Sequence, residues 1–381
     1  MFFSGSARLS KKLPVLGDLP RRLDELLRDV GGGDVLDVDD LARSLGASSE
    51  LLGRVLAEAA GAEIDLLRAE RYVVCPRCQM LNPAHEREAA VAAGEEYRCS
   101  DCDLDLAATV VQEVTRHRLS ESALTEAEER RAAERARPKR TAVVITALPV
   151  EFSAVLGHLS DAREQKHDAG TIYNVGAFRG ETTDWTIAVA VIGAGNPGAA
   201  AEAERAIATF TPDIALFVGV AGGIKDVTIG DVVAANEVYL YHAGKAADDF
   251  IARFAGDKGS YELVQRATQE AISASWRERA GDSAAESKAV VAPIAAGEQV
   301  VVSIKSDTYE LIRSRYDRAV AVEMEGSGFL RAAWANQDVR ALVVRGISDL
   351  LEGKDAADAG GSQETAAMHA SAFAFEVLAK L

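Results

Sequence analysis

Beyond residue 140 the chain alternates short apolar runs with amphipathic stretches. The runs suit strands that are buried on both faces, as in a parallel sheet. They lie at residues 142–147, 187–192, 213–218 and 341–344, with further strands expected at 230–233 and 238–241. An alanine-rich helical stretch follows the second run. This alternation of buried strands and helices predicts an α/β domain with three layers.

The first 72 residues show helical periodicity instead. The apolar positions of residues 20–30 recur at helical spacing, and three consecutive glycines end the pattern. Residues 37–45 predict a second helix, and Ser48 is placed to cap a third. An extended stretch follows at residues 71–74. This order resembles a winged helix-turn-helix, while a small helical bundle of another kind fits equally well.

Four cysteines form two C-x-x-C pairs, Cys75 with Cys78 and Cys99 with Cys102, with 20 residues between the pairs. Two pairs at this spacing match a four-thiolate structural zinc site. We therefore expect a zinc ribbon over residues 73–108 that holds one Zn²⁺ and leaves no open position for catalysis. Buried structural thiols and a redox C-x-x-C are the alternatives.

The segment between the ribbon and the α/β domain is polar. Residues 109–119 alternate in part and predict a strand. Residues 120–140 are rich in Glu, Arg and Ala and predict an exposed helical linker, whose basic end favours a solvated face over a nucleic-acid contact. The predicted domains are a winged-helix-like module (1–72), a zinc ribbon (73–108), a strand with a charged linker (109–140) and an α/β domain (141–381).

The composition narrows the classes of protein that fit. At 381 residues, 48% of them hydrophobic, the chain is long enough for two or more domains with a large core. The formal net charge of −17 argues against a general nucleic-acid coat, while a protein or nucleic-acid partner of the N-terminal module stays open. No apolar run reaches the ~20 residues of a membrane span, and the start lacks the apolar core of a signal peptide. We expect a cytoplasmic protein with no membrane partner.

Polar side chains gather where the last apolar run ends. Arg345, Ser348 and Asp349 follow it directly. Glu323 and Glu325 lie shortly upstream. Ligands of parallel sheets bind beyond the carboxyl ends of the strands, so this is the predicted site of chemistry. On the local pattern alone, a solvated strand end is an equally good interpretation.

Residues 141–381 resemble the purine nucleoside phosphorylase superfamily, and within it most of all the 5′-methylthioadenosine/S-adenosylhomocysteine nucleosidases. The resemblance rests on motifs that occur in the family's order and implies a three-layer nucleoside-phosphorylase-like α/β fold. They are I-T-A-L-P-V-E (145–151), G-A-G-N (193–196), F-V-G-V-A-G-G-I-K-D (217–226), A-G-E-Q-V (296–300), A-V-E-M-E-G (321–326) and V-R-G-I-S-D (344–349). The glycine-rich turns let backbone amides approach a ligand, but neither is a dinucleotide fingerprint or a P-loop.

The resemblance also implies residue roles. Breaking a purine N-ribosidic bond needs an acid at the base, a stabiliser for an oxocarbenium-like sugar and a nucleophile on the opposite face. By resemblance, Asp349 is the general acid at purine N7, Glu325 accepts hydrogen bonds from the ribose hydroxyls, and Glu151 positions and deprotonates water. Arg345 would orient these carboxylates. The implied substrate contacts are Met324 at the sugar, Gly222 and Gly223 along the nucleoside, the backbone of Val300 and Val301 at the adenine edge, and Glu323, Ala221 and Ser348.

Two positions depart from the family pattern. Val220 stands where the family has a serine, and Val300 where it has an aromatic residue that stacks on the base. The segments 238–245 and 248–287 resemble nucleosidase domains that are fused to regulatory modules in bacterial conflict and defence proteins, some of which act on nucleotides such as ATP. Lys245, Arg253 and Lys305 are then candidates for a 5′-phosphate contact, although a surface position is the favoured interpretation for each.

The predicted function is hydrolysis of the N-ribosidic bond of a purine nucleoside or nucleotide, with adenine as the expected base. Phosphorolysis is the alternative reaction. A carboxylate repels phosphate but activates water, so Glu151 favours hydrolysis, unless it only begins a helix. A nucleotide-sensing regulator is the alternative of another class. The resemblance also implies a homo-oligomer, at least a dimer, and no organic cofactor.

Overall fold

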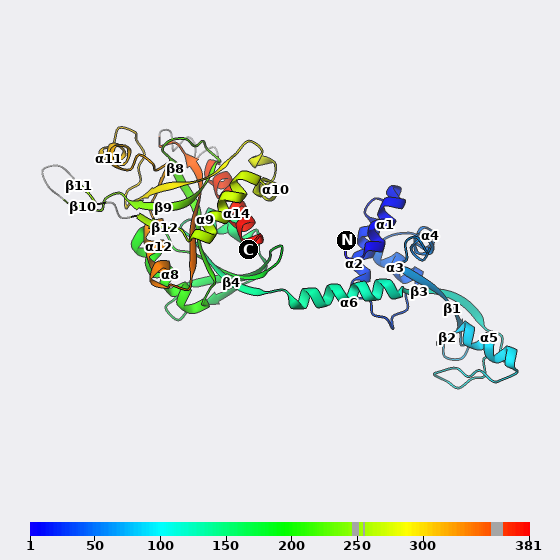
Figure 1. Cartoon of the computed structure of the whole chain (residues 1–381). Coiled ribbons are helices and arrows are strands. Elements are labelled where there is room, and N and C mark those ends of the chain that lie inside the picture. The colour runs from blue at the N-terminus through cyan, green and yellow to red at the C-terminus, as the bar shows by residue number, and fades with distance from the viewer. Residues whose placement is uncertain (246–250, 254–255, 352–360) are drawn as a thin grey trace. The chain divides into compact units, whose positions relative to one another are not determined.

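The computed structural model describes residues 1–245, 251–253, 256–351 and 361–381 (Figure 1). The predicted insert at 248–287 lies partly outside these ranges. The chain divides into two compact units, Met1–Ala136 and Arg137–Leu381. Within the ranges given, no helix combines the length and apolar character that crossing a membrane requires.

The C-terminal unit alternates strands and helices. Its strands are β4 (Lys139–Thr146), β5 (Ser160–Lys166), β6 (Ile172–Arg179), β7 (Asp184–Val191), β8 (Ile214–Gly223), β9 (Val232–Leu240), β10 (Gly244–Lys245), β11 (Ile251–Ala252), β12 (Gly256–Lys258), β13 (Ala289–Ala296), β14 (Ala321–Glu323) and β15 (Arg340–Asp349). Its helices are α7 (Pro149–Leu156), α8 (Asn196–Phe210), α9 (Tyr261–Ser273), α10 (Trp276–Ala280), η2 (Asp282–Ala284), α11 (Asp307–Arg315), α12 (Gly326–Ala335) and α14 (Ser362–Ala379).

One mixed sheet forms the middle of this unit, in the order β12-β9-β13-β14-β8-β4-β7-β6-β5, with β15 paired to both β8 and β9. The four strands β4, β7, β8 and β15 run parallel. The pairings from β8 through β15, β9, β13 and β14 return to β8, so this part of the sheet closes on itself. The closure brings the ends of β8, β13, β14 and β15 to one place.

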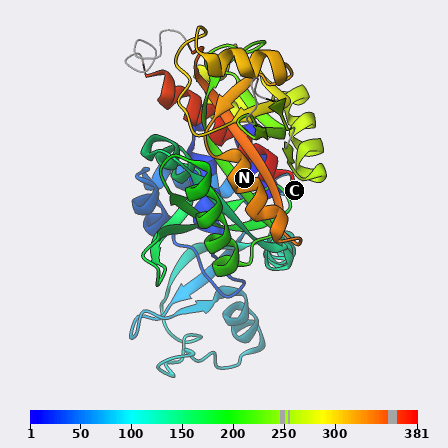
Figure 2. The ribbon, with the colours of Figure 1, turned by 90° about the vertical axis from the view of Figure 1, so that its left-hand side faces the viewer.

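Helices cover both faces of the sheet (Figures 1 and 2). Strand β4 shows the alternation, because Val143 and Ile145 join one apolar cluster while Ala142 and Val144 join the other. The first cluster includes α8 and α12, and the second includes α7, α9, α10 and α14. The predicted three-layer α/β fold is therefore confirmed.

The apolar runs locate the buried strands correctly, since they fall in β4, β7, β8 and β15. The two strands expected at 230–233 and 238–241 are wrong as separate elements, because they form the single strand β9. The polar residues Asn236 and Glu237 interrupt its apolar pattern where β12 pairs alongside. Strand β5 gave no signal, because it is a charged edge strand whose residues are all exposed.

The N-terminal unit combines helices with a three-stranded antiparallel sheet of order β2-β1-β3. Its elements are α1 (Ser4–Lys12), η1 (Pro14–Leu16), α2 (Leu19–Leu27), α3 (Val38–Leu45), α4 (Ser49–Ala59), β1 (Leu67–Val74), β2 (Leu81–Pro83), α5 (Ala84–Ala93), β3 (Gln112–Leu119) and α6 (Glu121–Ala136). Ser48 caps α4 as expected, since its Oγ accepts the N–H of Leu51 at 3.2 Å. The winged-helix assignment itself stays a prediction.

Helix α6 differs from the exposed linker that its charges suggested. Ala123 and Ala127 are buried in the same apolar cluster as α1 to α4. These two alanines lie one helical turn apart, so a narrow stripe of small residues suffices to pack α6 on this core. The beginning of the predicted linker is thus part of the N-terminal unit.

Candidate active site

A cavity in the C-terminal unit contains most of the predicted site residues. Its volume is about 320 Å³, within the range of small-molecule sites. The predicted residues that line it are Glu151, Ala221, Gly222, Val300, Val301, Glu323, Met324, Glu325, Ser348 and Asp349. Two predicted residues do not line it: Arg345 lies behind the glutamates, and Gly223 lies against the side chains of Val227 and Ile347.

The topology explains why motifs that are distant in sequence meet here. Residues 220–222 lie in the last part of β8, Glu323 ends β14, and Asp349 ends β15. Helices α7 and α12 begin at the same edge and supply Glu151 and Glu325. In α/β sheets, ligands bind beyond the carboxyl ends of strands. The site therefore lies where the ring of strand pairings brings several such ends together.

Backbone N–H groups hold Glu151 in place. Its side chain is only 1% exposed. Oε2 accepts the N–H groups of Ala147 at 2.7 Å and Leu148 at 2.9 Å. Oε1 accepts the N–H of Val220 at 2.8 Å. Glu151 thus belongs to the first turn of α7 and faces the cavity as well, so its place in the helix does not remove it from the site.

Arg345 organises the other two glutamates. Its Nη2 donates to Glu323 Oε2 and, at 3.0 Å, to Glu325 Oε2. Glu323 also accepts the N–H groups of Glu325 and Gly326 and so caps α12. Glu325 Oε1 accepts the N–H of Gly195 at 3.1 Å, from the turn before α8. Each carboxylate is thus fixed from two directions.

The Arg345 side chain is fully buried and needs space beside β8. Its guanidinium lies over the Phe217 ring, 4.4 Å from the centroid, in a cation–π contact. A Cβ placed on Gly219 would overlap both the guanidinium and the Glu151 carboxylate. A glycine at position 219 is therefore required for Arg345 to approach Glu151.

Asp349 is buried at the end of β15. Its Oδ1 accepts the N–H of Leu351 at 3.0 Å, and its Oδ2 lies 3.1 Å from Ser348 Oγ. The Ser348 hydroxyl is also 3.5 Å from the carbonyl oxygen of Ala221. These contacts hold the Asp349 carboxyl group at the cavity wall.

Glu151, Glu323 and Glu325 lie around the buried Arg345, and burial changes the ionisation of two of them. Burial raises the pKa of Glu325 to about 7, against the attraction of Arg345, and the neighbouring Glu323 adds to the rise. Burial also raises the pKa of Glu151, against the attraction of Arg345 and the three backbone N–H groups. Near neutral pH, Glu325 therefore exchanges readily between its protonated and ionised forms.

Sequence reasoning missed several lining residues, which are Ala147, Leu148, Ala194, Gln299, Val322 and Gln363. All but Gln363 lie inside the motifs quoted above, so the motifs were the available signal. Gln363 lies in the first turn of α14, and no motif in the sequence indicated that it lines the cavity. At the two positions that depart from the family pattern, Val220 lines the cavity and donates its N–H to Glu151, and Val300 is 58% exposed.

The charges on the cavity wall have one sign. Four carboxylic acids line it, and no lysine or arginine does so among the residues that the structure describes. Lys245, Arg253 and Lys305 are exposed and outside this lining. Within the described part of the chain, no cationic side chain of the cavity wall could pair with a bound anion.

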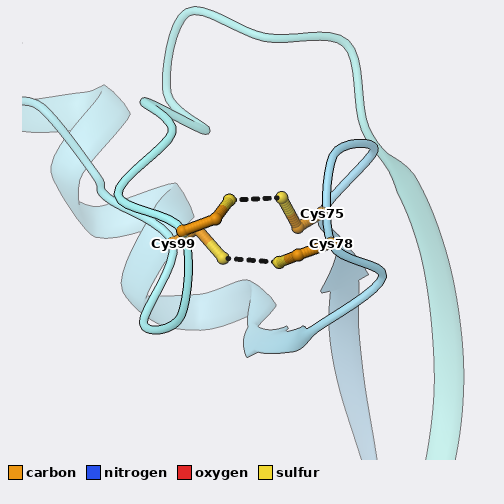
Figure 3. A group of neighbouring side chains, drawn as sticks. Cys75, Cys78 and Cys99 are labelled. Carbon is orange, nitrogen blue, oxygen red and sulfur yellow. Dashed lines mark hydrogen bonds between the residues drawn. The ribbon is translucent and has the colours of Figure 1, made fainter.

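The four cysteines come together in the N-terminal unit (Figure 3). Their sulfur atoms all lie within 4.8 Å of one another. Cys75 Sγ is 3.4 Å from Cys102 Sγ, and Cys78 Sγ is 3.5 Å from Cys99 Sγ. Four thiol groups at this spacing suit a metal ion that prefers sulfur ligands.

Comparison with known proteins identifies the larger unit. Residues 141–381 match the family model of the phosphorylase superfamily, which is more than half of the chain. The chain belongs to this superfamily. The match begins two residues after the start of β4 and runs through α14, so the superfamily domain includes every cavity residue named above.

Proteins similar to this chain include nucleosidases. The ATP nucleosidase Cap17 of Escherichia coli (strain KTE188) is 28% identical over 256 residues, which cover 61% of this chain and 50% of that protein. The 5′-methylthioadenosine/S-adenosylhomocysteine nucleosidase of Haemophilus ducreyi is 25% identical over 181 residues, covering 46% of this chain and 72% of that enzyme. The matched part of this chain thus corresponds to half the length of the Cap17 relative.

Solved structures support the same fold. A 5′-methylthioadenosine/S-adenosylhomocysteine nucleosidase from Colwellia psychrerythraea 34H, in complex with adenine, aligns with a TM-score of 0.54 and 24% identity over 64% of this chain and 97% of that one. A futalosine hydrolase mutant of Helicobacter pylori strain 26695 aligns with a TM-score of 0.54 and 22% identity over 64% of this chain and all of that one. Both alignments confirm the nucleoside-phosphorylase-like fold of the superfamily domain.

Removing the shared cation should destabilise the superfamily domain. Arg345→Met leaves Glu323, Glu325 and Glu151 buried without a counter-charge, which costs about 3–5 kcal/mol in the free energy of unfolding. Burial already raises the pKa values of Glu151 and Glu325 above the ordinary value of 4.5, and in the folded variant they rise further. Because the folded state then binds more protons than the unfolded chain, stability falls as the pH rises from 5 to 8.

Urea unfolding followed by tryptophan fluorescence measures this loss, since all three tryptophans, Trp185, Trp276 and Trp334, lie in the superfamily domain. Arg340→Met is the matched control, because Arg340 lies on the same strand and pairs with Glu262 at the surface. We expect a much smaller loss in the control. Equal losses in the two variants, or a pH-independent loss in Arg345→Met, would contradict the proposed charge balance.

Proposed function

We propose that the superfamily domain hydrolyses the N-ribosidic bond of a purine nucleoside or nucleotide and releases the base, with adenine as the expected base. The observation that carries this proposal is Glu151, a buried carboxylate at the cavity wall with a raised pKa. A hydrolase needs a base of this kind to activate water. Its position between three N–H donors fixes it without another side chain.

The charge on the cavity wall favours water over phosphate as the nucleophile. A phosphorylase has to hold an anionic phosphate beneath the sugar, where cations or N–H donors are needed. Here Glu151 already takes the N–H groups of Ala147, Leu148 and Val220. A phosphate at that place would meet a carboxylate and repulsion. A neutral water molecule would meet a hydrogen-bond acceptor.

Glu325 and Met324 are suited to hold the sugar. Arg345 and the N–H of Gly195 leave the Glu325 carboxylate at the cavity wall, where it can accept the hydroxyl groups of a ribose. An ionised Glu325 would also stabilise the positive charge that develops on the sugar as the bond to the base breaks. Met324 adds an apolar contact at the same wall.

Asp349 is suited to activate the leaving group. A purine departs readily only when it is protonated, and a carboxylic acid hydrogen-bonded to N7 supplies that proton. Ser348 and the N–H of Leu351 hold Asp349 in place for this role. Gly222 and the backbone at Val300 and Val301 complete the wall that would face the base.

The names of the relatives support this proposal. One relative is an ATP nucleosidase and another a 5′-methylthioadenosine/S-adenosylhomocysteine nucleosidase. Both names describe removal of a base from an adenine nucleoside or nucleotide. We extend this activity to the present chain and, given the fused N-terminal unit, to a defence or regulatory setting in bacteria.

Base release should not depend on phosphate. We expect the purified chain to release adenine from ATP, 5′-methylthioadenosine or S-adenosylhomocysteine in phosphate-free buffer, with no stimulation by added phosphate. Chromatography of base and sugar products measures this. Glu151→Gln should lower turnover by about 10²–10⁴-fold, as expected for loss of a general base. Glu202→Gln is a control, since Glu202 is a buried carboxylate bonded to Tyr173 outside the cavity lining.

Tryptophan fluorescence has to show that Glu151→Gln is folded, because its amide cannot accept all three N–H groups. A strict phosphate requirement with ribose 1-phosphate as the product would replace hydrolysis by phosphorolysis. Tight binding of these compounds without turnover would favour the nucleotide-sensing regulator.

Loss of the acid should act on turnover and spare binding. Asp349→Asn keeps the shape of the side chain but removes the titratable proton, so we expect kcat to fall by about 10²–10⁴-fold. KM should change little, because the contacts with sugar and base remain. Steady-state kinetics with a single substrate measures both constants. A variant with the kcat of the wild type would remove Asp349 from the mechanism.

A further inference from the structure

The cysteine cluster lies in an excursion between two paired strands. β1 and β3 pair over eight residues, from Leu67 opposite Leu119 to Val74 opposite Gln112. Residues 75–111 leave the ladder at its open end and return to it, as both views show (Figures 1 and 2). The four-cysteine segment is therefore nested inside the helix-and-strand module, where the sequence had predicted it to follow that module.

The two C-x-x-C turns have the same geometry. In the first, the N–H of Cys75 donates to the carbonyl of Met80, and the N–H of Gln79 donates to the carbonyl of Cys75, both at 2.9 Å. In the second, the N–H of Cys99 donates to the carbonyl of Leu104, and the N–H of Asp103 donates to the carbonyl of Cys99. Donor and acceptor are separated by the same number of residues as in the first turn. The residue after each pair, Gln79 or Asp103, has a positive φ, 65° and 58°.

A non-glycine residue adopts this conformation at some energetic cost, so it persists where its surroundings require it. Here the two turns aim four sulfur atoms at one point. Around a tetrahedral zinc ion with Zn–S bonds of ~2.3 Å, the sulfur atoms lie roughly 3.8 Å apart. The sulfurs of this cluster are separated by between 3.4 and 4.8 Å, and all four cysteines are free.

A neighbouring amide supports the cluster. Asn82 is 1% exposed, and its Nδ2 lies 3.6 Å from Cys99 Sγ. Its Oδ1 accepts the N–H of Ser100 at 3.0 Å, which fixes the orientation of the amide. N–H donors to coordinating sulfur are typical partners of metal ligands.

The excursion has little apolar core of its own. Apart from cysteines, the buried cluster here contains Ala84 and Leu106 of the excursion together with Val73 of β1. Segments below ~40 residues usually need disulfides, a metal or a partner to fold. Besides the pairing of β2 with β1 and a few partly buried apolar side chains, the strongest stabilising contact that this cluster can offer is a metal bound by its thiolates.

We propose that Cys75, Cys78, Cys99 and Cys102 bind one zinc ion, and that this ion folds residues 75–111, with α5 and β2, while leaving the β1–β3 ladder and the helices α1 to α4 and α6 unaffected. The excursion is then a zinc-closed extension of a β-hairpin. This proposal is independent of the reaction in the superfamily domain.

Metal analysis and hydrogen exchange of the full chain test it together. We expect about one zinc per chain in protein purified under reducing conditions without chelator. Stripping the zinc with a chelator should increase amide exchange across residues 75–111 and at residues 72–74, which pair with β2, with protection kept in β3 and in residues 67–71 of β1. Cys99→Ser should lose the zinc, whereas His85→Ala, an exposed residue of the same excursion, should retain it.

Wild-type chelation keeps the test valid if Cys99→Ser does not fold. Zinc-free protein with protected amides in residues 75–111 would overturn the proposal, as would full zinc content in Cys99→Ser. Loss of protection that spreads through β3 and residues 67–71 of β1 would overturn the claim that the ion acts locally.

A second observation concerns the cavity wall. Glu298 follows β13 and immediately precedes Gln299, which lines the cavity. Its Oε1 accepts the Asn196 Nδ2–H at 2.9 Å and the Asn196 N–H at 3.3 Å. Asn196 is the first residue of α8, and Gly195 before it donates to Glu325.

These bonds join the two sides of the site. The loop after β13 carries the proposed base wall, and the turn before α8 holds the proposed ribose acceptor. Asn196 also accepts the N–H of Gly328 through its Oδ1 at 2.9 Å, so it cannot rotate freely. We infer that Glu298 is a positioning residue that fixes the base wall relative to Glu325. This inference rests on the proposed function, from which it takes adenine as the ligand of the base wall.

Glu298→Ala should weaken adenine binding about tenfold, the loss expected for one hydrogen bond to a charged group. Titration calorimetry with adenine measures the affinity, and hydrogen exchange at residues 299–301 measures the loop itself. Glu298→Gln, which keeps an acceptor oxygen, should recover part of both. Glu310→Gln on α11 is the exposed control.

If wild-type protein does not bind adenine, the proposed base is wrong, and the exchange measurement alone decides the role of Glu298. Unchanged exchange at residues 299–301 in Glu298→Ala would then overturn the inference. Unchanged adenine affinity would overturn it where wild-type protein does bind.

Discussion

One buried guanidinium determines the arrangement of the candidate site. Arg345 has no contact with water, and Glu323, Glu325 and Glu151 surround it, with the first two bonded to Nη2. Two of these carboxylates begin helices and the third ends a strand, so the ion group also fixes how α7 and α12 start. The arrangement depends on Gly219, because any side chain there would enter the space that the guanidinium fills. The same group of side chains thus balances the buried charge, caps the helices and sets the geometry of the site.

This constraint also explains the proposed chemistry. A single positive charge among three buried carboxylates leaves a negative site, in which the pKa of Glu325 reaches about 7. Such a site repels a bound phosphate, stabilises a developing positive charge on a sugar and can take a proton from water. Buried carboxylates reduce the stability of a protein core, and here the same carboxylates would take part in bond cleavage. Function would therefore be gained at a cost in stability.

The sequence predicted the superfamily domain well because its signals are local. Apolar runs mark buried strands, and the motifs that end them carry Glu151, Glu325, Arg345 and Asp349. The sequence could not predict a contact made by a single residue far from any motif, such as Gln363. It also could not predict β5, a charged edge strand whose residues are exposed. The nesting of the cysteine segment depends on the pairing of β1 with β3. This pairing joins strands that are far apart in the sequence, and the composition of neither strand indicates its partner. The burial of Ala123 in α6 likewise depends on a partner surface.

The most direct test of the account is the origin of the oxygen atom on the released sugar. A single turnover in water enriched in ¹⁸O, with phosphate present, labels C1′ of the sugar product if water attacks there. The account predicts one ¹⁸O atom in the sugar product and none in the base. A sugar product that carries phosphate at C1′ and no label would contradict the assignment of Glu151 as the base that activates water.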